Sequence, residues 1–428
     1  MDYTMSLSVE ADPFSAEETD QATPLTLRPI PRISIQAFCL TGEVAEVIDR
    51  TGKDRRVAKV HLIVRSGSIA DATEFYRSAS TPNLLILETH DEPQDLMDRL
   101  SGLAEVCDPS TKVVIIGHYN DVALYRELIR AGVSEYLVAP INLADVIGTI
   151  SDIFVDPSAK PLGRTIAFIG AKGGVGSSTL AHNISWALSE TFENEVVIAD
   201  LDLPFGTANI DFDQDPPQGI AEAVFSPNRI DEVYLDRLLT ECSKHLSLLA
   251  APSSLERVYD FDAEAFSPIV ETAQRTAPTV ILDIPHGWTS WISTTLARAD
   301  EIVITAAPDL ANLRNAKSLM DALKKLRPND AAPRLILNQS GVPKKPEISA
   351  SDFGSALGVK PLATIPFDPP TFGKAANAGR MIGQLNPKHP ISQTINQVAF
   401  ALAGRREVQG KKKPKLAAIF SRFTSKKK

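Results

Sequence analysis

The sequence predicts an α/β protein built from two units, each with a parallel sheet covered by helices. Short apolar runs alternate with amphipathic stretches along residues 32–154, and again along residues 165–404. Strands that alternate with helices in this way are typical of parallel sheets with helices on both faces. A glycine-rich turn also joins an apolar strand to an amphipathic helix within residues 168–188. Such a turn is typical of doubly wound folds that bind phosphate groups.

The apolar runs divide the chain into its predicted parts. Those of the first unit are RISIQAF, KVHLIV, NLLILE, KVVIIG and EYLVAP, and those of the second are TIAFIGA, EVVIAD, LSLLAAP, PTVILDIP, EIVITAAP, RLILNQS and PLATIPFD. The runs of the second unit are apolar enough to be buried on both faces of a parallel sheet. We therefore expect a disordered lead-in (1–31), a first unit (32–154), a linker (155–164), a second unit (165–404) and a basic tail (405–428).

Composition and cysteine usage indicate a globular protein of the cytoplasm. The chain has 428 residues, of which 43% are hydrophobic and 23% charged. Its cysteines, Cys39, Cys107 and Cys242, are odd in number and widely separated, which argues against a disulfide framework. No apolar run reaches the roughly 18 residues needed to cross a bilayer, and the acidic start lacks the basic region of a signal peptide. Neither the cysteines nor the histidines have a spacing typical of a metal site.

Charge is unevenly distributed along the chain, which has a net charge of -9. Residues 405–428 contain ten Lys or Arg and a single Glu, so the rest of the chain is strongly acidic. An acidic body disfavours a general nucleic-acid-binding surface. In the tail, Leu416, Ile419, Phe420 and Phe423 form an apolar stripe at helical spacing between basic flanks. This pattern favours attachment to an anionic membrane surface, with a partner-docking peptide, an inert tail and a nucleic-acid contact as alternatives.

The strand and helix order of the first unit resembles that of a response-regulator receiver domain. Receiver domains transfer a phosphoryl group to an aspartate in an acidic, magnesium-binding pocket, and the positions that match this pocket differ here. They are Ala37, Phe38 and Cys39 for the acids, Glu88 for the phosphoacceptor, Gly117 for the hydroxyl and Ala139 for the lysine. We expect no Mg²⁺-dependent phosphorylation, and interpret Glu88 as a solvated loop carboxylate, with a permanently charged mimic as the alternative. The first unit is then a docking or dimerisation module.

The glycine-rich turn, GAKGGVGSST, is the strongest functional signal in the chain. Gly173, Gly174 and Gly176 allow backbone N–H groups to curl around phosphate oxygens, and a helix that begins near Ser177 adds its dipole there. The hydroxyl of Ser178 can bind Mg²⁺. A turn that only joins the strand to the helix is the alternative interpretation. The pattern predicts a site for the phosphates of a nucleotide.

Within this turn, KGGVGSST resembles the deviant Walker A box of the MinD/ParA superfamily, KGGxGK[ST][ST]. The resemblance implies that Lys172 is the superfamily's signature lysine, a catalytic candidate that reaches the nucleotide of the facing subunit in a dimer. Ser177 stands where the superfamily has its usual P-loop lysine. The missing charge predicts weaker ATP binding, slower turnover, or both, so that the protein is at most a weak ATPase. The implied phosphate-binding residues are Lys172, Gly173, Gly174, Val175, Gly176, Ser177, Ser178 and Thr179.

Acidic residues at the ends of two later strands extend the resemblance. In VVIADLDLPFGTAN, Asp200 and Asp202 resemble the switch I box, which implies that Asp202 orients the attacking water and Asp200 lies at the metal; a helix N-cap is the alternative. In TVILDIPHGW, Asp283 resembles the Walker B aspartate, which holds a water on Mg²⁺. The implied metal ligands are thus Asp200, Asp283 and Ser178. Three residues after the last strands match adenine contacts of relatives, or are turn residues: Asn338, Pro366 and Asp368.

A degenerate receiver-like unit followed by a loop with Ser177 resembles, in particular, the TadZ/CpaE family of pilus-assembly proteins. The resemblance implies a homodimer that binds ATP and Mg²⁺ through the second unit and places the tight-adherence (Flp, type IVb) pilus secretion machinery at a cell pole or similar site. We expect pilus secretion components as partners, a peripheral position at the inner face of the cytoplasmic membrane, and no nucleic-acid partner. The alternatives are a cycling MinD-like ATPase for another membrane-associated complex and a ParA-like DNA partitioning ATPase.

Overall fold

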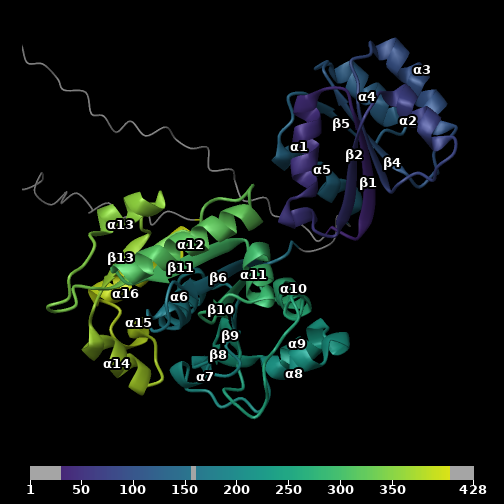
Figure 1. Cartoon of the computed structure of the whole chain (residues 1–428). Helices are drawn as coiled ribbons and strands as arrows, with labels where there is room; N and C mark the ends of the chain where they lie inside the picture. Colours follow the sequence, from purple (N-terminus) through teal and green to yellow (C-terminus); the bar gives the residue numbers. More distant parts are fainter. Residues whose placement is uncertain (1–29, 156–160, 405–428) are drawn as a thin grey trace, which may run out of the picture.

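The computed structural model describes residues 30–155 and 161–404, which form two α/β units (Figure 1). Most of the predicted lead-in, the centre of the predicted linker and the whole basic tail lie outside the described residues. Both units contain the parallel sheets that the sequence predicts. Among the described residues, no helix is both long and apolar enough to cross a membrane.

The first unit is a five-stranded parallel sheet with the strand order β2-β1-β3-β4-β5. Each strand matches one of the five predicted apolar runs. The strands are β1 (Ile33–Cys39), β2 (Val60–Ser66), β3 (Leu84–Glu88), β4 (Lys112–Gly117) and β5 (Glu135–Val138). All five residues of β3 are buried, as the central strand of a sheet covered on both faces requires.

Helices cover both faces of the first sheet. Apolar side chains of α1 (Gly42–Gly52) and α5 (Leu143–Phe154) pack on one face. Those of α2 (Ile69–Tyr76), α3 (Pro93–Ala104) and α4 (Val122–Arg130) pack on the other. A short 3₁₀ helix, η1 (Arg55–Val57), follows α1. Cys39, Glu88 and Gly117, which match positions of the receiver pocket, are the last residues of β1, β3 and β4. They therefore lie at the same edge of the sheet, where the parallel strands end.

The second unit is an eight-stranded sheet with the order β13-β12-β11-β6-β10-β7-β9-β8. Seven strands are parallel and match the seven predicted runs: β6 (Arg164–Gly170), β7 (Val196–Asp200), β9 (Leu246–Leu249), β10 (Thr279–Ile284), β11 (Glu301–Ala306), β12 (Arg334–Ser340) and β13 (Ala363–Pro366). The eighth strand, β8 (Thr240–Ser243), pairs antiparallel with β9 at the edge. It was not predicted, because its sequence TECS carries no apolar pattern.

Alternate residues of the central strands face two separate cores. Ile166 and Phe168 of β6 pack on one side of the sheet, and Ala167 and Ile169 on the other. Helices α6 (Ser177–Phe192), α7 (Ala208–Asp211), α14 (Pro369–Asn377), α15 (Ile382–Leu385) and α16 (Pro390–Leu402) cover the first side. Helices α8 (Ile220–Phe225), α9 (Glu232–Leu238), α10 (Ser267–Thr276), α11 (Ser290–Arg298), α12 (Leu310–Leu326) and α13 (Ala350–Leu357) cover the second, and η2 (Pro227–Arg229) joins α8 to α9.

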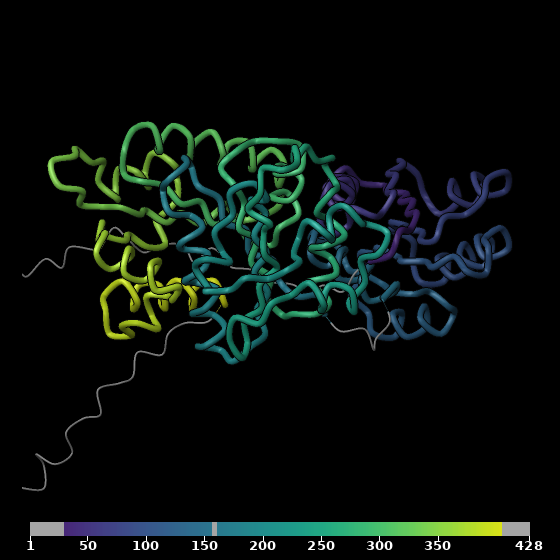
Figure 2. Tube along the Cα trace, turned by 90° about the horizontal axis from the view of Figure 1, so that it is seen from below, coloured from purple at the N-terminus to yellow at the C-terminus, as the bar shows by residue number. Residues whose placement is uncertain are grey.

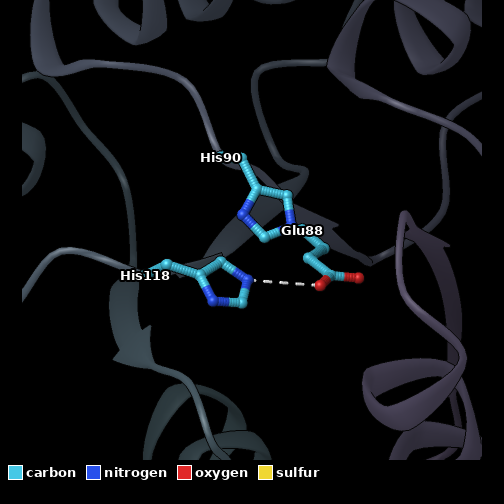
Figure 3. A group of neighbouring side chains, drawn as sticks. All are labelled: Glu88, His90 and His118. Atoms are coloured by element: carbon cyan, nitrogen blue, oxygen red, sulfur yellow. Dashed lines mark hydrogen bonds and ion pairs between the residues drawn. The ribbon is translucent and has the colours of Figure 1, made fainter.

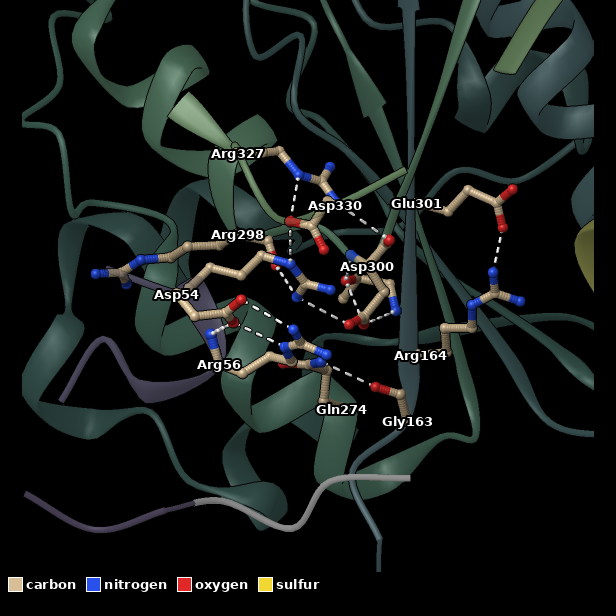
Figure 4. A network of polar contacts seen from close by, with 12 residues as sticks. Asp54, Arg56, Gly163, Arg164, Gln274, Arg298, Asp300, Glu301, Arg327 and Asp330 are labelled. Carbon is tan, nitrogen blue, oxygen red and sulfur yellow. Dashed lines mark hydrogen bonds and ion pairs between the residues drawn. The ribbon is translucent and has the colours of Figure 1, made fainter. Parts of the chain in front are cut away.

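The two units lie side by side (Figures 1 and 2), and residues of η1 and the end of α1 contact the second unit. The guanidinium of Arg55 forms ion pairs with Asp300 (3.0 Å) and Asp330 (3.1 Å) of the second unit. Asn329 accepts hydrogen bonds from the Arg50 side chain at 3.3 Å. The acidic partners belong to a polar network that also includes Arg327, which pairs with Asp330 at 3.0 Å (Figure 4). This contact fixes the position of one unit relative to the other.

Candidate nucleotide-binding site

The glycine-rich loop lies at the carboxyl edge of the second sheet, between β6 and α6, as the sequence predicts. Gly174 and Gly176 have φ angles of +77° and +84°, in the left-handed region that favours glycine. Gly176 is also the N-cap of α6, and a Cβ atom on it would lie 2.6 Å from Nδ2 of Asn338. Side chains are therefore excluded at these two positions, and the loop backbone stays exposed at the start of the helix.

Side chains from neighbouring strands and helices hold the loop in place. The Nδ2 amide of Asn338 donates to the carbonyl oxygen of Val175 at 2.8 Å, and the Nε2 amide of Gln339 donates to that of Gly174 at 2.9 Å. Asn315 of α12 donates to the carbonyl of Ala171 at 3.0 Å. These bonds involve carbonyl groups of the loop and none of its N–H groups. A phosphate-binding loop requires this, because its N–H groups bind the phosphate oxygens.

Three buried polar atoms around the loop have no hydrogen-bond partner among the described residues. They are Oγ of Ser177, Oδ1 of Asp283 and Oγ1 of Thr305. Ser178 and Thr179, one and two residues further along α6, are half-buried, and Lys172 is exposed. Since an unpaired buried polar group is costly, these atoms fit a site that is completed by a ligand. Hydroxyl and carboxylate oxygens are the ligands that Mg²⁺ takes beside nucleotide phosphates.

The two predicted metal-binding acids end adjacent strands, with β7 paired directly to β10. Asp200 is buried, and its carboxylate accepts hydrogen bonds from the backbone N–H groups of Asp202 (3.1 Å) and Ala208 (3.2 Å). Burial, together with repulsion from Asp283, raises the pKa of Asp200. A divalent cation would relieve this repulsion, so the pair fits Mg²⁺. The bond to Ala208, the first residue of α7, means that Asp200 also holds a helix start.

Asp202, the residue predicted to orient an attacking water, lies just beyond β7 and is half-buried. Its Oδ1 accepts a hydrogen bond from the backbone N–H of Phe205 at 3.2 Å. Burial, and to a smaller extent the charge of Asp283, raises the pKa of its carboxyl. The carboxylate thus lies beyond the end of β7, at the same sheet edge as the loop.

A buried histidine that the sequence did not single out joins these acids. His182, one turn beyond Ser178 on α6, is fully buried, and its Nδ1 lies 2.7 Å from Oδ2 of Asp211. Its Nε2 lies 3.3 Å from Oδ2 of Asp283, an ion pair in which the ring N–H is not directed at the oxygen. Burial alone would lower the pKa of His182, but the two carboxylates outweigh it and raise the pKa to about 10. The ring is thus an imidazolium beside the predicted Walker B aspartate.

A cavity of about 350 Å³ adjoins the loop. Predicted residues that line it are Gly174, Gly176, Thr179, Asn338, Pro366 and Asp368. Sequence reasoning missed several other lining residues, among them Asn183, Asp211, Gln339, Phe372 and Arg380. The cavity combines aromatic rings with amide groups, which suits a planar heterocyclic base. Asp368 has a structural task as well, because its carboxylate caps α14 through Thr371.

Exposed apolar side chains follow the strands at the same edge. Phe205 after β7, Trp288 after β10 and Leu310 after β11 are 67%, 47% and 73% exposed. Trp291, three residues beyond Trp288, is instead buried against Phe266, with ring centroids 4.6 Å apart. An apolar surface around a phosphate loop is unusual for a site that meets only water, and it fits a macromolecular contact.

In the first unit, one expectation about the receiver positions is wrong. Glu88 is not a solvated loop carboxylate, because only 1% of its surface is exposed and two backbone N–H groups donate to it. Gly117 has no room for a hydroxyl-bearing side chain, since a Cβ atom there would overlap the ring of Tyr136. Ala37, Phe38 and Cys39 are buried within the sheet.

Comparisons with known proteins agree with this geometry. Residues 163–335 match the AAA domain family. The chain is 27% identical over 216 residues to the septum site-determining protein MinD of Synechocystis, which covers 48% of this chain and 77% of that protein. A ParA family ATPase from Chlorobium tepidum has a similar structure, with a TM-score of 0.51 and 26% identity over 55% of this chain and 98% of that chain.

A further similarity concerns less of the chain. The pilus assembly protein CpaE from Caulobacter crescentus is 46% identical over 30% of this chain and 98% of that chain, with a TM-score of 0.30. Taken with the loop and the strand order, the longer matches show that the second unit is similar to AAA domains and has homologues among the MinD and ParA ATPases.

Proposed function

We propose that the protein is an ATP-binding, dimer-forming localisation factor that acts as a scaffold for assembly of a Flp (type IVb, tight-adherence) pilus secretion machinery. The observation that carries this proposal is the phosphate loop, which is intact in its backbone but has Ser177 in place of a lysine. Such a loop can still bind phosphates through its N–H groups, whereas it lacks the charge that supports phosphoryl transfer. Binding is thereby favoured over turnover.

ATP and Mg²⁺ are the proposed cofactors. Residues 172–179 would surround the phosphates, and Asn338, Pro366 and Asp368 would contact the base in the adjoining cavity. Ser178, Asp200 and Asp283 would hold Mg²⁺, which neutralises phosphate charge when it is bound. The unpaired oxygen of Asp283 and the raised pKa of Asp200 support this assignment.

The dimer would form through the edge of the sheet that carries the loop. Lys172 is exposed there, and in the proposed dimer it would contact the nucleotide of the second copy. Phe205, Trp288 and Leu310 are exposed at the same edge and would be buried by that copy. The dimer would thus bury an apolar surface together with two nucleotides. Nucleotide binding would therefore stabilise the dimer.

The pilus part of the proposal rests on the sequence pattern, namely a receiver-like unit without its acidic pocket ahead of a loop with Ser177. Pilus secretion components are the proposed partners. A position at the inner face of the cytoplasmic membrane or at a cell pole would depend on the basic tail, which lies outside the described residues. A cycling MinD-like ATPase is the second candidate, in which Asp202, half-buried beyond the end of β7, would orient the attacking water. A ParA-like DNA partitioning ATPase is less favoured by the acidic body.

The test is light scattering of the purified chain with ATP·Mg²⁺, with ADP·Mg²⁺ and without nucleotide, while phosphate release is followed in the same samples. We expect a dimer with ATP and little phosphate release. Lys172→Ala should abolish the dimer, because its cation compensates phosphate charge at the interface. Lys360→Ala is the matched control, since Lys360 is exposed just before β13, at the opposite edge of the parallel sheet.

Other outcomes distinguish the alternatives. Dimers that decay as phosphate appears, with turnover abolished by Asp202→Ala, would favour the cycling ATPase. Salt-sensitive binding to nonspecific duplex DNA would favour the partitioning protein. If nucleotide neither binds nor changes the assembly, Ser177 has disabled the loop, and the proposal is wrong.

A further inference from the structure

Three side chains in the first unit gather at the carboxyl edge of its sheet, remote in sequence from the nucleotide site. Glu88 is the last residue of β3, His90 lies two residues later, and His118 directly follows β4. One ligand atom of each residue lies within 4.8 Å of those of the other two. Figure 3 shows the His118 ring directed at the Glu88 carboxylate, with the His90 ring beside it. We call these three residues the Glu88 cluster.

The carboxylate of the Glu88 cluster is held rigidly. Its Oε2 accepts hydrogen bonds from the backbone N–H groups of Leu40 (2.7 Å) and Thr41 (2.9 Å), and its Oε1 accepts one from the Thr41 hydroxyl (2.7 Å). Three donors from the segment that follows β1 thus fix the orientation of this carboxylate. In metal sites, hydrogen bonds of this kind to a ligand residue orient it toward the ion.

One lone pair of Oε1 remains after the bond to Thr41, because each carboxylate oxygen accepts two hydrogen bonds. Nε2 of His118 lies near it at 3.3 Å, which is long for a charge-assisted hydrogen bond. A cation between these two atoms would bind both, through a lone pair of Oε1 and the lone pair of the imidazole nitrogen. The carboxylate is thus oriented for a third partner on the side of the histidines.

The two histidines are arranged as a pair of nitrogen ligands. Their rings stack with centroids 3.9 Å apart and an angle of 20° between the planes. Both residues are exposed, in contrast to the buried Glu88, so water molecules can complete a coordination sphere. Imidazole nitrogen is the commonest metal ligand that protein side chains offer.

The donor set decides the class of ion. Two imidazole nitrogens and one carboxylate oxygen suit Zn²⁺, Cu²⁺ or Ni²⁺, whereas Mg²⁺ takes oxygen ligands. At the end of β1, Ala37, Phe38 and Cys39 provide no acid that could assist Mg²⁺. We propose that Glu88, His90 and His118 form a binding site for a divalent transition-metal ion, with water in the remaining positions.

Metal binding at this site would connect two loops of the first unit. His90 belongs to the segment between β3 and α3, and His118 to the segment between β4 and α4. A bound ion would hold both against the sheet and so fix the start of α4. The exposed residues Val122, Tyr125 and Ile129 on α4 would then be presented on a more rigid surface. The site belongs to the first unit alone, so its occupancy is independent of the nucleotide proposal.

Zinc titration of the full chain tests the proposal. The chain, purified without a histidine tag and freed of metal with a chelator that is then removed, is titrated with ZnCl₂ in a calorimeter without nucleotide. We expect one saturable site per chain. His90→Ala and His118→Ala should each weaken it by at least about tenfold, because loss of a direct ligand costs no less than loss of a supporting residue. Co²⁺ in place of Zn²⁺ gives visible absorption bands that report on the ligands.

His61→Ala is the matched control, because His61 is exposed on β2 of the same unit and outside the cluster. It should bind zinc like the unchanged chain. Both cluster histidines are exposed, so their substitution leaves the core intact, and circular dichroism checks this. Absence of saturable zinc binding would overturn the proposal. Binding that persists unchanged in the His90→Ala and His118→Ala chains would also overturn it, since the ion would then lie elsewhere.

Discussion

At the scale of single residues, the buried His182 links the chemistry of the second unit to its stability. Its imidazolium lies between the carboxylates of Asp211 and Asp283, at 2.7 and 3.3 Å. Removal of one member of a buried ion cluster leaves the others without compensation. The ring therefore has two effects. It compensates the charges of the buried acids, and it brings positive charge to the helix that begins with Ser177.

His182→Ala should lower the free energy of unfolding of the second unit by about 3 kcal/mol or more, as expected for a broken buried ion cluster. Urea titration followed by tryptophan fluorescence measures this unit selectively, because Trp186, Trp288 and Trp291 all belong to it. His245→Ala removes an ion pair with the 56% exposed Glu195 and should cost less than about 1 kcal/mol. Equal losses in the two variants would mean that the His182 cluster has no such role.

At the scale of elements, β12 shapes the phosphate loop from across the sheet. Its pairing with β13 shifts register between Leu337 and Ser340, and such irregularities redirect side chains. Asn338 and Gln339 lie within this irregular stretch, and both bind carbonyl groups of the loop. Asn338 is buried, whereas Gln339 is half-buried. Water can therefore replace the hydrogen bond from Gln339 more easily than the one from Asn338.

Asn338→Ala should weaken nucleotide binding, because the carbonyl of Val175 loses its donor and the loop its fixed shape. One hydrogen bond contributes about 1 kcal/mol, which corresponds to roughly fivefold in the dissociation constant of a fluorescent ATP analogue. Gln393→Ala on α16 removes an amide whose bond to Lys388 is exposed, and it should leave affinity unchanged. Equal affinity in both variants would show that the loop keeps its shape without the hydrogen bond from Asn338 to Val175.

At the scale of the whole molecule, Arg55 connects the first unit to the sheet that carries the loop. Its partner Asp300 also accepts hydrogen bonds from the backbone N–H and the hydroxyl of Thr165, both at 2.8 Å. Thr165 lies at the start of β6, whose other end leads into the phosphate loop. The Arg55 side chain is 16% exposed, so this ion pair is better shielded from water than an ordinary surface pair.

Arg55→Ala should loosen the contact between the units, because two acids then lose their shared cation. Small-angle X-ray scattering of the monomeric chain without nucleotide should show a larger radius of gyration than for the unchanged protein. Arg77→Ala breaks an ion pair whose side chains are 65% and 74% exposed, and it should leave the scattering unchanged. A curve for Arg55→Ala that superimposes on the unchanged one would contradict a docking role for Arg55.

Local pattern alone was sufficient for most of the fold. The apolar runs predicted every parallel strand, most clearly β3, β7 and β11, which are buried over their whole length and must therefore be apolar. The glycines of the loop were recognised because Gly174 and Gly176 need backbone angles that other residues avoid. β8 was not predicted, because a strand at the edge of a sheet can be polar and its sequence has no apolar pattern. These features depend on neighbours in sequence, so the sequence reports them directly.

Contacts between distant segments had to come from the folded chain. His182 meets Asp211 and Asp283 across intervals of 29 and 101 residues, and His118 meets Glu88 across 30. No local spacing marks such groups, because parallel strands bring their carboxyl ends together irrespective of the length of the connections. The burial of Glu88 has the same origin. Backbone N–H groups that follow β1 enclose a carboxylate that ends β3, and only the pairing of these two strands in the sheet makes them neighbours.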